Sequence, residues 1–158
     1  MAESHRIAEQ LTMAFEGDTW TGRPVRDIVR SFTAASAART SAPGGKSAWE
    51  ILAHIVTWLR IARLRLGGQA ASPTDAEDFP PIKDRSEAAW RALWTEAERE
   101  YRDLADAVRT TPDDRLEATA PGQSYPIYHL LHGVIQHSLY HAGQLALLAR
   151  MANAPARG

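Results

Sequence analysis

The chain has 158 residues, 44% of them hydrophobic, which fits one compact globular domain and leaves no room for a second. Its 18 basic and 19 acidic residues give a net charge of −1, which excludes a generally basic nucleic-acid binder and a strongly acidic tail protein. Cysteine is absent, which excludes disulfide frameworks, cysteine-based zinc sites, iron–sulfur clusters and a cysteine nucleophile.

The N-terminal segment predicts a helix over residues 2–15. Its apolar residues Ile7, Leu11 and Phe15 fall on one side, and Gly17 ends the pattern. The first residues lack the apolar core of a secretory signal, and no apolar run approaches the ~20 residues of a membrane span. We therefore expect a cytoplasmic protein with no membrane segment. The 16 Arg against 2 Lys indicate a GC-rich bacterial genome.

A second long helix is expected over residues 47–66. Its start carries a capping box, in which the Ser47 hydroxyl accepts from the backbone N–H of Glu50 and the Glu50 carboxylate accepts from the N–H of Ser47. Two glycines, at 67–68, end it.

Shorter segments connect the long helices. Residues 24–32 form a short helical piece, and residues 40–45 are a loop by composition. The polar, Pro-rich connection over residues 69–85 is long for a bundle, and we expect it to cross the bundle or to shape a pocket. Another loop covers residues 110–123.

Two more long helices are predicted, over residues 86–109 and 124–151. The first has an apolar stripe at helical spacing. Ser124 is expected to cap the second, with Pro126 in its first turn. Four long helices without strand signals predict an all-α, four-helix bundle that forms a single domain over residues 1–158.

Three of the six histidines fall in apolar company on two predicted helices. On the last helix His141 lies inside the apolar stripe and His137 at its edge, so both imidazoles face the core. His54 lies beside the apolar face of the helix over 47–66. Burial is unfavourable for an imidazole unless both ring nitrogens have partners, and a divalent metal takes one nitrogen of each ring. Two interpretations stay open here: core histidines bonded to backbone or Gln, and an open three-histidine metal site.

Neighbouring residues complete the candidate site. An imidazole set without thiolates suits Zn, Ni, Fe or Cu better than Mg or Ca, and open positions would hold water or substrate. Tyr140 and Gln144 flank the His pair as candidate hydrogen-bond donors to the ligands. Trp58, one turn after His54, is a candidate pocket wall, with core packing as the alternative. Three other histidines are expected to be surface or half-buried residues without a catalytic role, and the two on the last helix point away from its core face: His5, His129 and His132.

Two motifs resemble one known family. The pattern His-x3-His-x-Gly-Gln at 137–144 resembles the closing helix of the DinB-like superfamily, a bacterial family of metal-binding four-helix bundles. The segment SAWEILAHI at 47–55 resembles the second helix of that family. The resemblance spans most of the chain, and both motifs have the family's order and separation. It implies an up-down-down-up bundle, with residues 69–85 as a long crossover between helices two and three, and often a homodimer.

The resemblance also implies a ligand set. A divalent transition metal (Zn, Ni or Fe) would be held by His54, His137 and His141. The chain departs from one common family form, which has a further His one turn before the first ligand of the last helix. That position is Gly133 here. The adjacent His132 faces elsewhere and is not counted as a ligand.

Several functions remain after this reasoning. Some relatives are S-transferases or isomerases that use a low-molecular-weight thiol as cosubstrate, and many have no assigned reaction. No carboxylate base lies on the strips that face the metal, and a metal-bound thiolate needs none, which favours thiol transfer to a small electrophilic substrate over hydrolysis. The alternatives are a metal-dependent hydrolase, a non-catalytic metal-binding stress-response protein, and a structural bundle without metal. Nucleic acid is not an expected partner, because no helix carries a basic stripe.

Overall fold

The structure is a computed structural model and describes residues 1–153. Over these residues the chain forms seven α-helices, one 3-10 helix and no β-strand, so the predicted all-α class is confirmed. In chain order the elements are α1 (Glu3–Glu16), α2 (Val25–Val29), α3 (Ala34–Ala37), α4 (Ala48–Leu66), α5 (Asp75–Asp78), α6 (Glu87–Arg109), η1 (Asp113–Glu117) and α7 (Ile127–Ala152). The predicted domain also includes residues 154–158, which lie outside the described residues.

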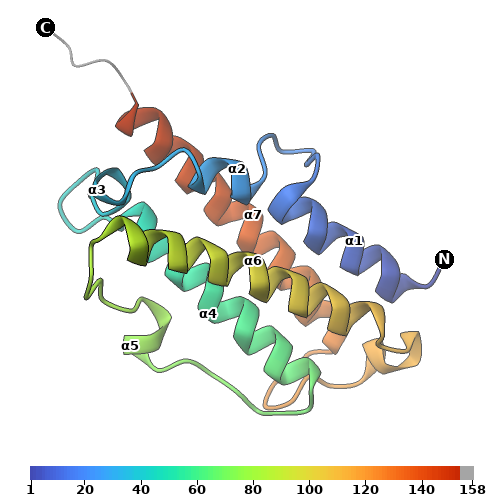
Figure 1. The fold of residues 1–158 in the computed structure, drawn as a ribbon. Helices are drawn as coiled ribbons and strands as arrows, with labels where there is room; N and C mark the ends of the chain where they lie inside the picture. Colours follow the sequence, from blue (N-terminus) through green and yellow to red (C-terminus); the bar gives the residue numbers. More distant parts are fainter. Residues whose placement is uncertain (154–158) are drawn as a thin grey trace, which may run out of the picture.

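Four long helices build the core. α4 packs against α6 and α7, and α1 packs against the same two helices (Figure 1). Their buried apolar side chains join one hydrophobic cluster, to which the short helices α2 and α3 also contribute. The largest fully buried side chains include Trp90, Tyr101, Leu52, Leu59, Leu131 and Leu145. The contact between α4 and α7 is the one that brings the predicted histidines together.

The start of α4 is fixed by the predicted capping box. The Ser47 hydroxyl accepts from the backbone N–H of Glu50 at 3.2 Å, and the Glu50 carboxylate accepts from the N–H of Ser47 at 3.0 Å. Such a cap stabilises a helix by about 1 kcal/mol. It sets where α4 begins, about two turns before His54.

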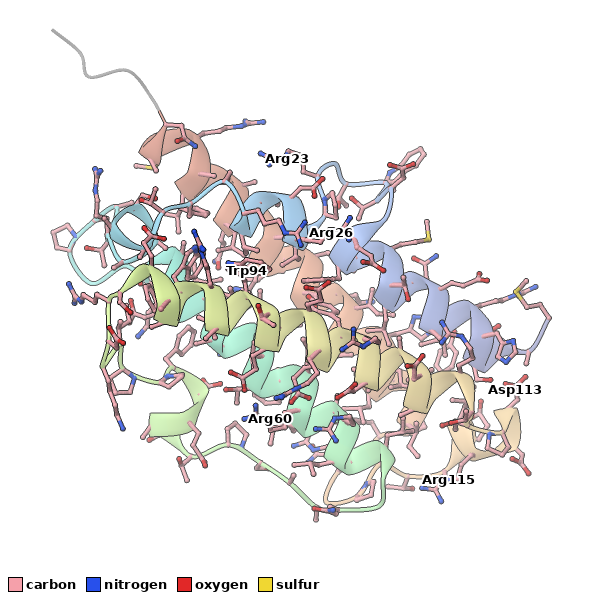
Figure 2. The ribbon with its side chains drawn as sticks, viewed as in Figure 1. Arg23, Arg26, Arg60, Trp94, Asp113 and Arg115 are labelled. Atoms are coloured by element: carbon pink, nitrogen blue, oxygen red, sulfur yellow. The ribbon has the colours of Figure 1, made fainter. Side chains whose placement is uncertain are left out.

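The outer side of α4 is tied to α6 by a buried carboxylate. Glu100 of α6 is only 2% exposed. It accepts from Arg60 Nε at 3.3 Å and from Arg63 Nη2 at 3.1 Å, and Figure 2 labels Arg60 on α4. Because the buried charge is paired with cations from the neighbouring helix, it favours one arrangement of α4 on α6. The opposite side of α4 is left to face α7.

The start of α7 differs from the prediction. The helix begins at Ile127 with Pro126 as its N-cap, and no side chain caps it, so the prediction of a Ser124 cap is wrong. Proline disfavours helical backbone in the residue before it, which keeps residues 124–125 outside the helix. The free N–H of Ile127 donates instead to the carbonyl oxygen of Ala118 at 2.9 Å.

The connection between α4 and α6 returns along the bundle. It leaves the end of α4, contains the one-turn helix α5, and reaches the start of α6 at the other end (Figure 1). α5 docks on α4, where the Thr57 hydroxyl donates to the carbonyl oxygen of Glu77 at 2.9 Å. In the described part of the chain, no helix is both long enough and apolar enough to cross a membrane.

Candidate metal centre

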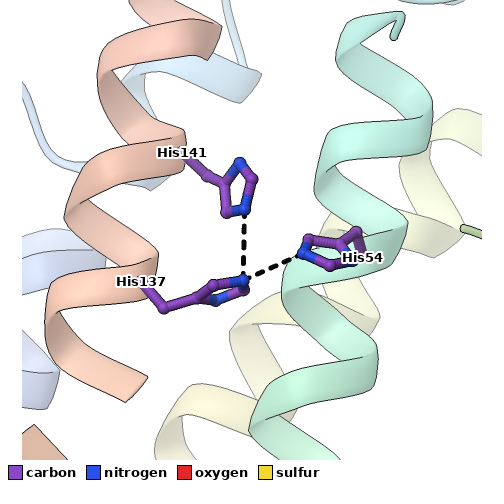
Figure 3. Close-up of side chains that lie close together, drawn as sticks. All are labelled: His54, His137 and His141. Atoms are coloured by element: carbon purple, nitrogen blue, oxygen red, sulfur yellow. Dashed lines mark hydrogen bonds between the residues drawn. The ribbon is translucent and has the colours of Figure 1, made fainter. Parts of the chain in front are cut away.

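Three imidazoles from α4 and α7 meet between the two helices (Figure 3). The Nε2 atoms of His54 and His137 lie 2.9 Å apart, and those of His137 and His141 lie 3.1 Å apart. One nitrogen from each ring lies within 4.8 Å of the other two. His54 and His141 are buried, and His137 is half-buried. The four-residue spacing on α7 puts two rings on one face, and the packing of α4 on α7 adds the third.

The outer nitrogens fix the tautomers of two rings. His54 Nδ1 lies 2.8 Å from the carbonyl oxygen of Asp78, which only accepts, so this nitrogen carries the proton. His141 Nδ1 donates to Gln144 Oε1 at 2.7 Å, while Gln144 Nε2 donates to the Tyr140 hydroxyl at 3.2 Å. In its neutral form each of these rings therefore turns an unprotonated Nε2 toward the centre of the cluster.

Protons alone do not satisfy the cluster. A neutral His137 carries at most one proton on Nε2, so it donates to one of its two neighbours and leaves the Nε2 lone pair of the other neighbour without a donor. Its Nδ1 is buried and has no hydrogen-bond partner within residues 1–153. A divalent cation at the centre fits these residues, since every Nε2 lone pair would point at it. A tetrahedral site with Zn–N bonds of ~2.0–2.1 Å has N···N edges of about 3.3 Å, near the two observed separations.

The electrostatics also suit a cation site. Burial, and after it the neighbouring His141 and His54, lower the pKa of His137 to about 4, although Asp78 acts in the opposite direction. Burial also lowers the pKa of His141, although its bond to Gln144 acts in the opposite direction. Both rings are therefore neutral at pH 7, which is the form of imidazole that binds a metal.

The connection between α4 and α6 covers the outer side of His54. The Phe79 ring stacks on the imidazole, with centroids 4.0 Å apart and planes at 5°. The Asp78 carboxylate accepts from Trp58 Nε1 at 2.7 Å and lies 3.1 Å from His54 Nδ1. The carbonyl and the carboxylate of Asp78 thus both hold the orientation of the His54 ring.

A cavity of about 350 Å³ between α4 and α7 borders the cluster. It is lined by His54, Trp58, Ala62, Arg65, Asp78, Tyr125, His129, Leu130, Gly133, Val134 and His137. At Gly133 an added Cβ would meet no atom within 4 Å, so the wall is open there. A small molecule in this space would reach the side of the cluster that the protein does not cover.

The structure brings the three predicted ligand residues together, but not all of their neighbours make the contacts that we expected. Gln144 contacts His141, but it accepts a hydrogen bond where we expected it to donate one. Tyr140 is 66% exposed, and its hydroxyl hydrogen-bonds Gln144 rather than a His nitrogen. Trp58 is half-buried and lines the cavity.

Other residues of the site were missed. Asp78 and Phe79 lie in the connection, where no sequence pattern indicated which residues reach α4. Arg65 had a detectable signal, because it follows His54 by three turns on the same strip of α4. His129 is exposed, as expected, but it also lines the cavity two turns before His137 instead of pointing away from it. Its neighbour His132 packs against the Tyr128 ring, away from the cluster.

Fold and site together define an all-helical protein with three histidines from two helices around one centre. The family model of the DinB superfamily matches residues 18–145, and the chain belongs to this superfamily. A crystal structure of a DinB-like protein from Bacillus cereus is similar, with a TM-score of 0.64 and 21% sequence identity over 84% of this chain and 85% of that chain. At this identity the likeness shows the fold. No curated protein matches the chain.

Proposed function

We propose that the protein is a metal-dependent enzyme that acts on a small electrophile, with Zn, Ni or Fe held by His54, His137 and His141. The observation that carries this proposal is the convergence of three Nε2 atoms beside a cavity. Among residues 1–153, no other His, Asp or Glu joins this group, so positions remain for exogenous ligands. Open positions distinguish catalytic metal sites from closed structural ones. Membership of the DinB superfamily supports the metal.

The residues around the cluster would prepare it for binding. Asp78 and Gln144 hold His54 and His141 in the tautomer whose Nε2 accepts a cation. Phe79 covers one face of the His54 ring and keeps water from it. A divalent metal, when bound, lowers the pKa of a water molecule or a thiol that enters the cavity.

Thiol-dependent S-transfer or isomerisation is the reaction we propose. Hydrolysis needs a group that accepts a proton from water, and the Asp78 carboxylate is already engaged by Trp58 and His54. A low-molecular-weight thiol with a pKa of ~8.5 loses its proton more easily than water and needs no such group. In S-transfer the sulfur forms a bond to the electrophilic carbon, and the leaving group departs with the electrons of the broken bond.

Elemental analysis of the untagged protein tests the metal. We expect near-stoichiometric Zn, Ni or Fe in the wild type and its loss in His137→Ala. His5→Ala removes an exposed histidine far from the cluster and should keep the metal. Absence of metal from the wild type, even after incubation with Zn and Ni, would reject the proposal.

Turnover separates the remaining alternatives. The metal-loaded wild type is assayed with a panel of thiols and electrophiles, and with ester and amide substrates without thiol. Thiol-dependent product supports S-transfer, and thiol-independent product supports a metal-dependent hydrolase. A protein that binds metal stoichiometrically and turns over nothing is a non-catalytic metal-binding protein, such as a stress-response protein.

We further propose a single domain with up-down-down-up order of its long helices. In support, α1 and α7 run toward one end of the bundle in Figure 1, and α4 and α6 run toward the other. We also propose a homodimer that buries part of α7. This helix exposes four large apolar residues, Tyr128, Tyr140, Leu147 and Met151. Light scattering should give twice the chain mass of 17.4 kDa, and a monomeric mass would reject the dimer.

A further inference from the structure

Arg65 is a buried positive charge in the wall of the cavity. It is only 3% exposed. Its Nε–H donates to the carbonyl oxygen of Ala71 at 2.8 Å. Its Nη1 and Nη2 groups donate to the hydroxyls of Tyr125 and Ser72, both at 3.2 Å. All three acceptors are uncharged, so none balances the charge of the guanidinium.

The two other arginines of α4 differ from Arg65 because each of them pairs with a carboxylate. Arg60 and Arg63 both pair with Glu100, although their side chains are 43% and 34% exposed. Within residues 1–153, no carboxylate oxygen lies within 4.0 Å of the more deeply buried Arg65 guanidinium. Burial of an unpaired charge is unfavourable. A guanidinium has five N–H groups, and three are used here, so two remain for an anion in the cavity.

The position of Arg65 relates it to the histidine cluster. Its guanidinium carbon lies 5.9 Å from the centroid of the Trp58 ring, and that centroid lies 6.0 Å from the centroid of His137. The two groups therefore flank the same indole, and a short molecule reaches both. Asp78 also lines the cavity, but its carboxylate contacts Trp58 and His54. Its charge serves the cluster rather than Arg65.

We propose that Arg65 and Tyr125 bind the carboxylate of a small-molecule substrate whose reactive end faces the three histidines. The reactive end rests on the function proposed above, whereas the anion site itself needs no metal. The planar donors of a guanidinium match a carboxylate, and one negative charge balances the one positive charge of Arg65. The Tyr125 hydroxyl accepts from Arg65 and can donate its own O–H to the carboxylate.

Matched ligands test the proposal on the wild-type protein. Metal-free protein is titrated with 3-mercaptopropionate, with the uncharged 3-mercaptopropanamide and with inorganic phosphate, and the indole N–H signal of Trp58 is followed by NMR. We expect the carboxylate to bind at least about tenfold more tightly than the amide, as for other charge-assisted hydrogen bonds. Equal affinity for acid and amide would overturn the proposal. Tighter binding of phosphate than of the carboxylate would overturn the carboxylate assignment.

Variants test whether Arg65 and Tyr125 cause the preference for the acid over the amide. Arg65→Gln should abolish the preference for acid over amide, and Tyr125→Phe should reduce it severalfold without cutting the bonds from Arg65 to residues 71–72. Arg91→Gln, which removes an exposed charge from α6, should leave the preference unchanged. If Arg65→Gln does not fold, the wild type and Tyr125→Phe still decide, because a preference unaffected by Tyr125→Phe overturns the role of that hydroxyl.

The carboxylate site and the proposed enzymatic function can fail independently, and the experiments distinguish the two failures. A metal-free protein that prefers the acid, combined with a metal-loaded protein that turns over nothing, supports the carboxylate site and rejects the enzyme. Turnover of acid and amide forms of one substrate with equal kcat/KM rejects the carboxylate site and keeps the enzyme.

Discussion

Without metal, the protein should lose stability as the pH falls from 6.5 to 4, because His137 stays neutral in the folded state. The unfolded chain protonates this imidazole with its ordinary pKa of 6.5, and the folded protein does so at about 4. Between these values the unfolded state binds more protons, so acid favours unfolding. The stabilising contribution is complete above pH 6.5, falls through the interval, and changes no further below pH 4.

The size of the effect follows from the pKa shift. One pKa unit corresponds to about 1.4 kcal/mol, so the full shift of His137 amounts to about 3 kcal/mol. His137 is half-buried, and solvent screening reduces the expected loss to about 2 kcal/mol. For a chain of this length, each kcal/mol changes Tm by about 2–4 °C. The pH drop should therefore lower Tm by about 4–8 °C through this residue alone.

The fall of Tm with pH is measured by thermal melts followed by circular dichroism. Wild type and His137→Gln are melted in EDTA at several pH values between 7.5 and 4. Gln does not titrate, and the carboxylates titrate alike in both proteins, so the difference between the two Tm curves isolates His137. A parallel fall of Tm in both proteins would show that this imidazole is not held neutral by the fold. The reasoning about its burial would then be wrong.

Three further contacts are each tested by a substitution, and two of the three have a matched control. Gln144→Leu removes the acceptor of the His141 Nδ1–H and should weaken Zn binding about 10–100-fold in a competition with a fluorescent chelator, whereas Gln144→Glu should not. Glu100→Gln removes the charge that pairs with α4 and should lower the free energy of unfolding in urea by about 1–3 kcal/mol without changing the metal content. Ser47→Ala should lower it by about 1 kcal/mol, and Ser41→Ala, in an exposed loop, should have no effect.

The long helices could be predicted because their signals are local. The two ends of α4 are marked by residues at the helix itself, the capping box at Ser47 and the glycine at 67. The apolar stripe of α6 repeats over six turns. α3 and α5 were not predicted, since four residues are too few to show helical periodicity. The predicted start of α7 was three residues early, because the Ile127 N–H is satisfied by the backbone carbonyl of Ala118 in the preceding connection and not by a capping side chain.

The residues of the site also differ in whether a local sequence pattern predicts them. His137 and His141 are related by helical spacing, so one sequence pattern predicts both, and His54 follows from its place on the strip of α4 that faces α7. Asp78 and Phe79 reach His54 only because the connection folds back along α4. Nothing local in the sequence specifies that path. The carboxylate beside the histidines therefore comes from none of the long helices but from Asp78, at the end of the short helix α5 in the connection.

Gly133 shows how the pieces of the site depend on one another. This position lies about one turn before His137 on α7, where a histidine side chain would bring a fourth imidazole toward the cluster. Here the residue is glycine, an added Cβ would meet nothing within 4 Å, and the space belongs to the cavity that also reaches Arg65. A cluster built only to retain a metal gains affinity from every added ligand. The absence of a fourth imidazole at this position, together with a buried guanidinium at the same cavity, therefore supports our proposal of a site that exchanges a bound small molecule rather than one that stores metal.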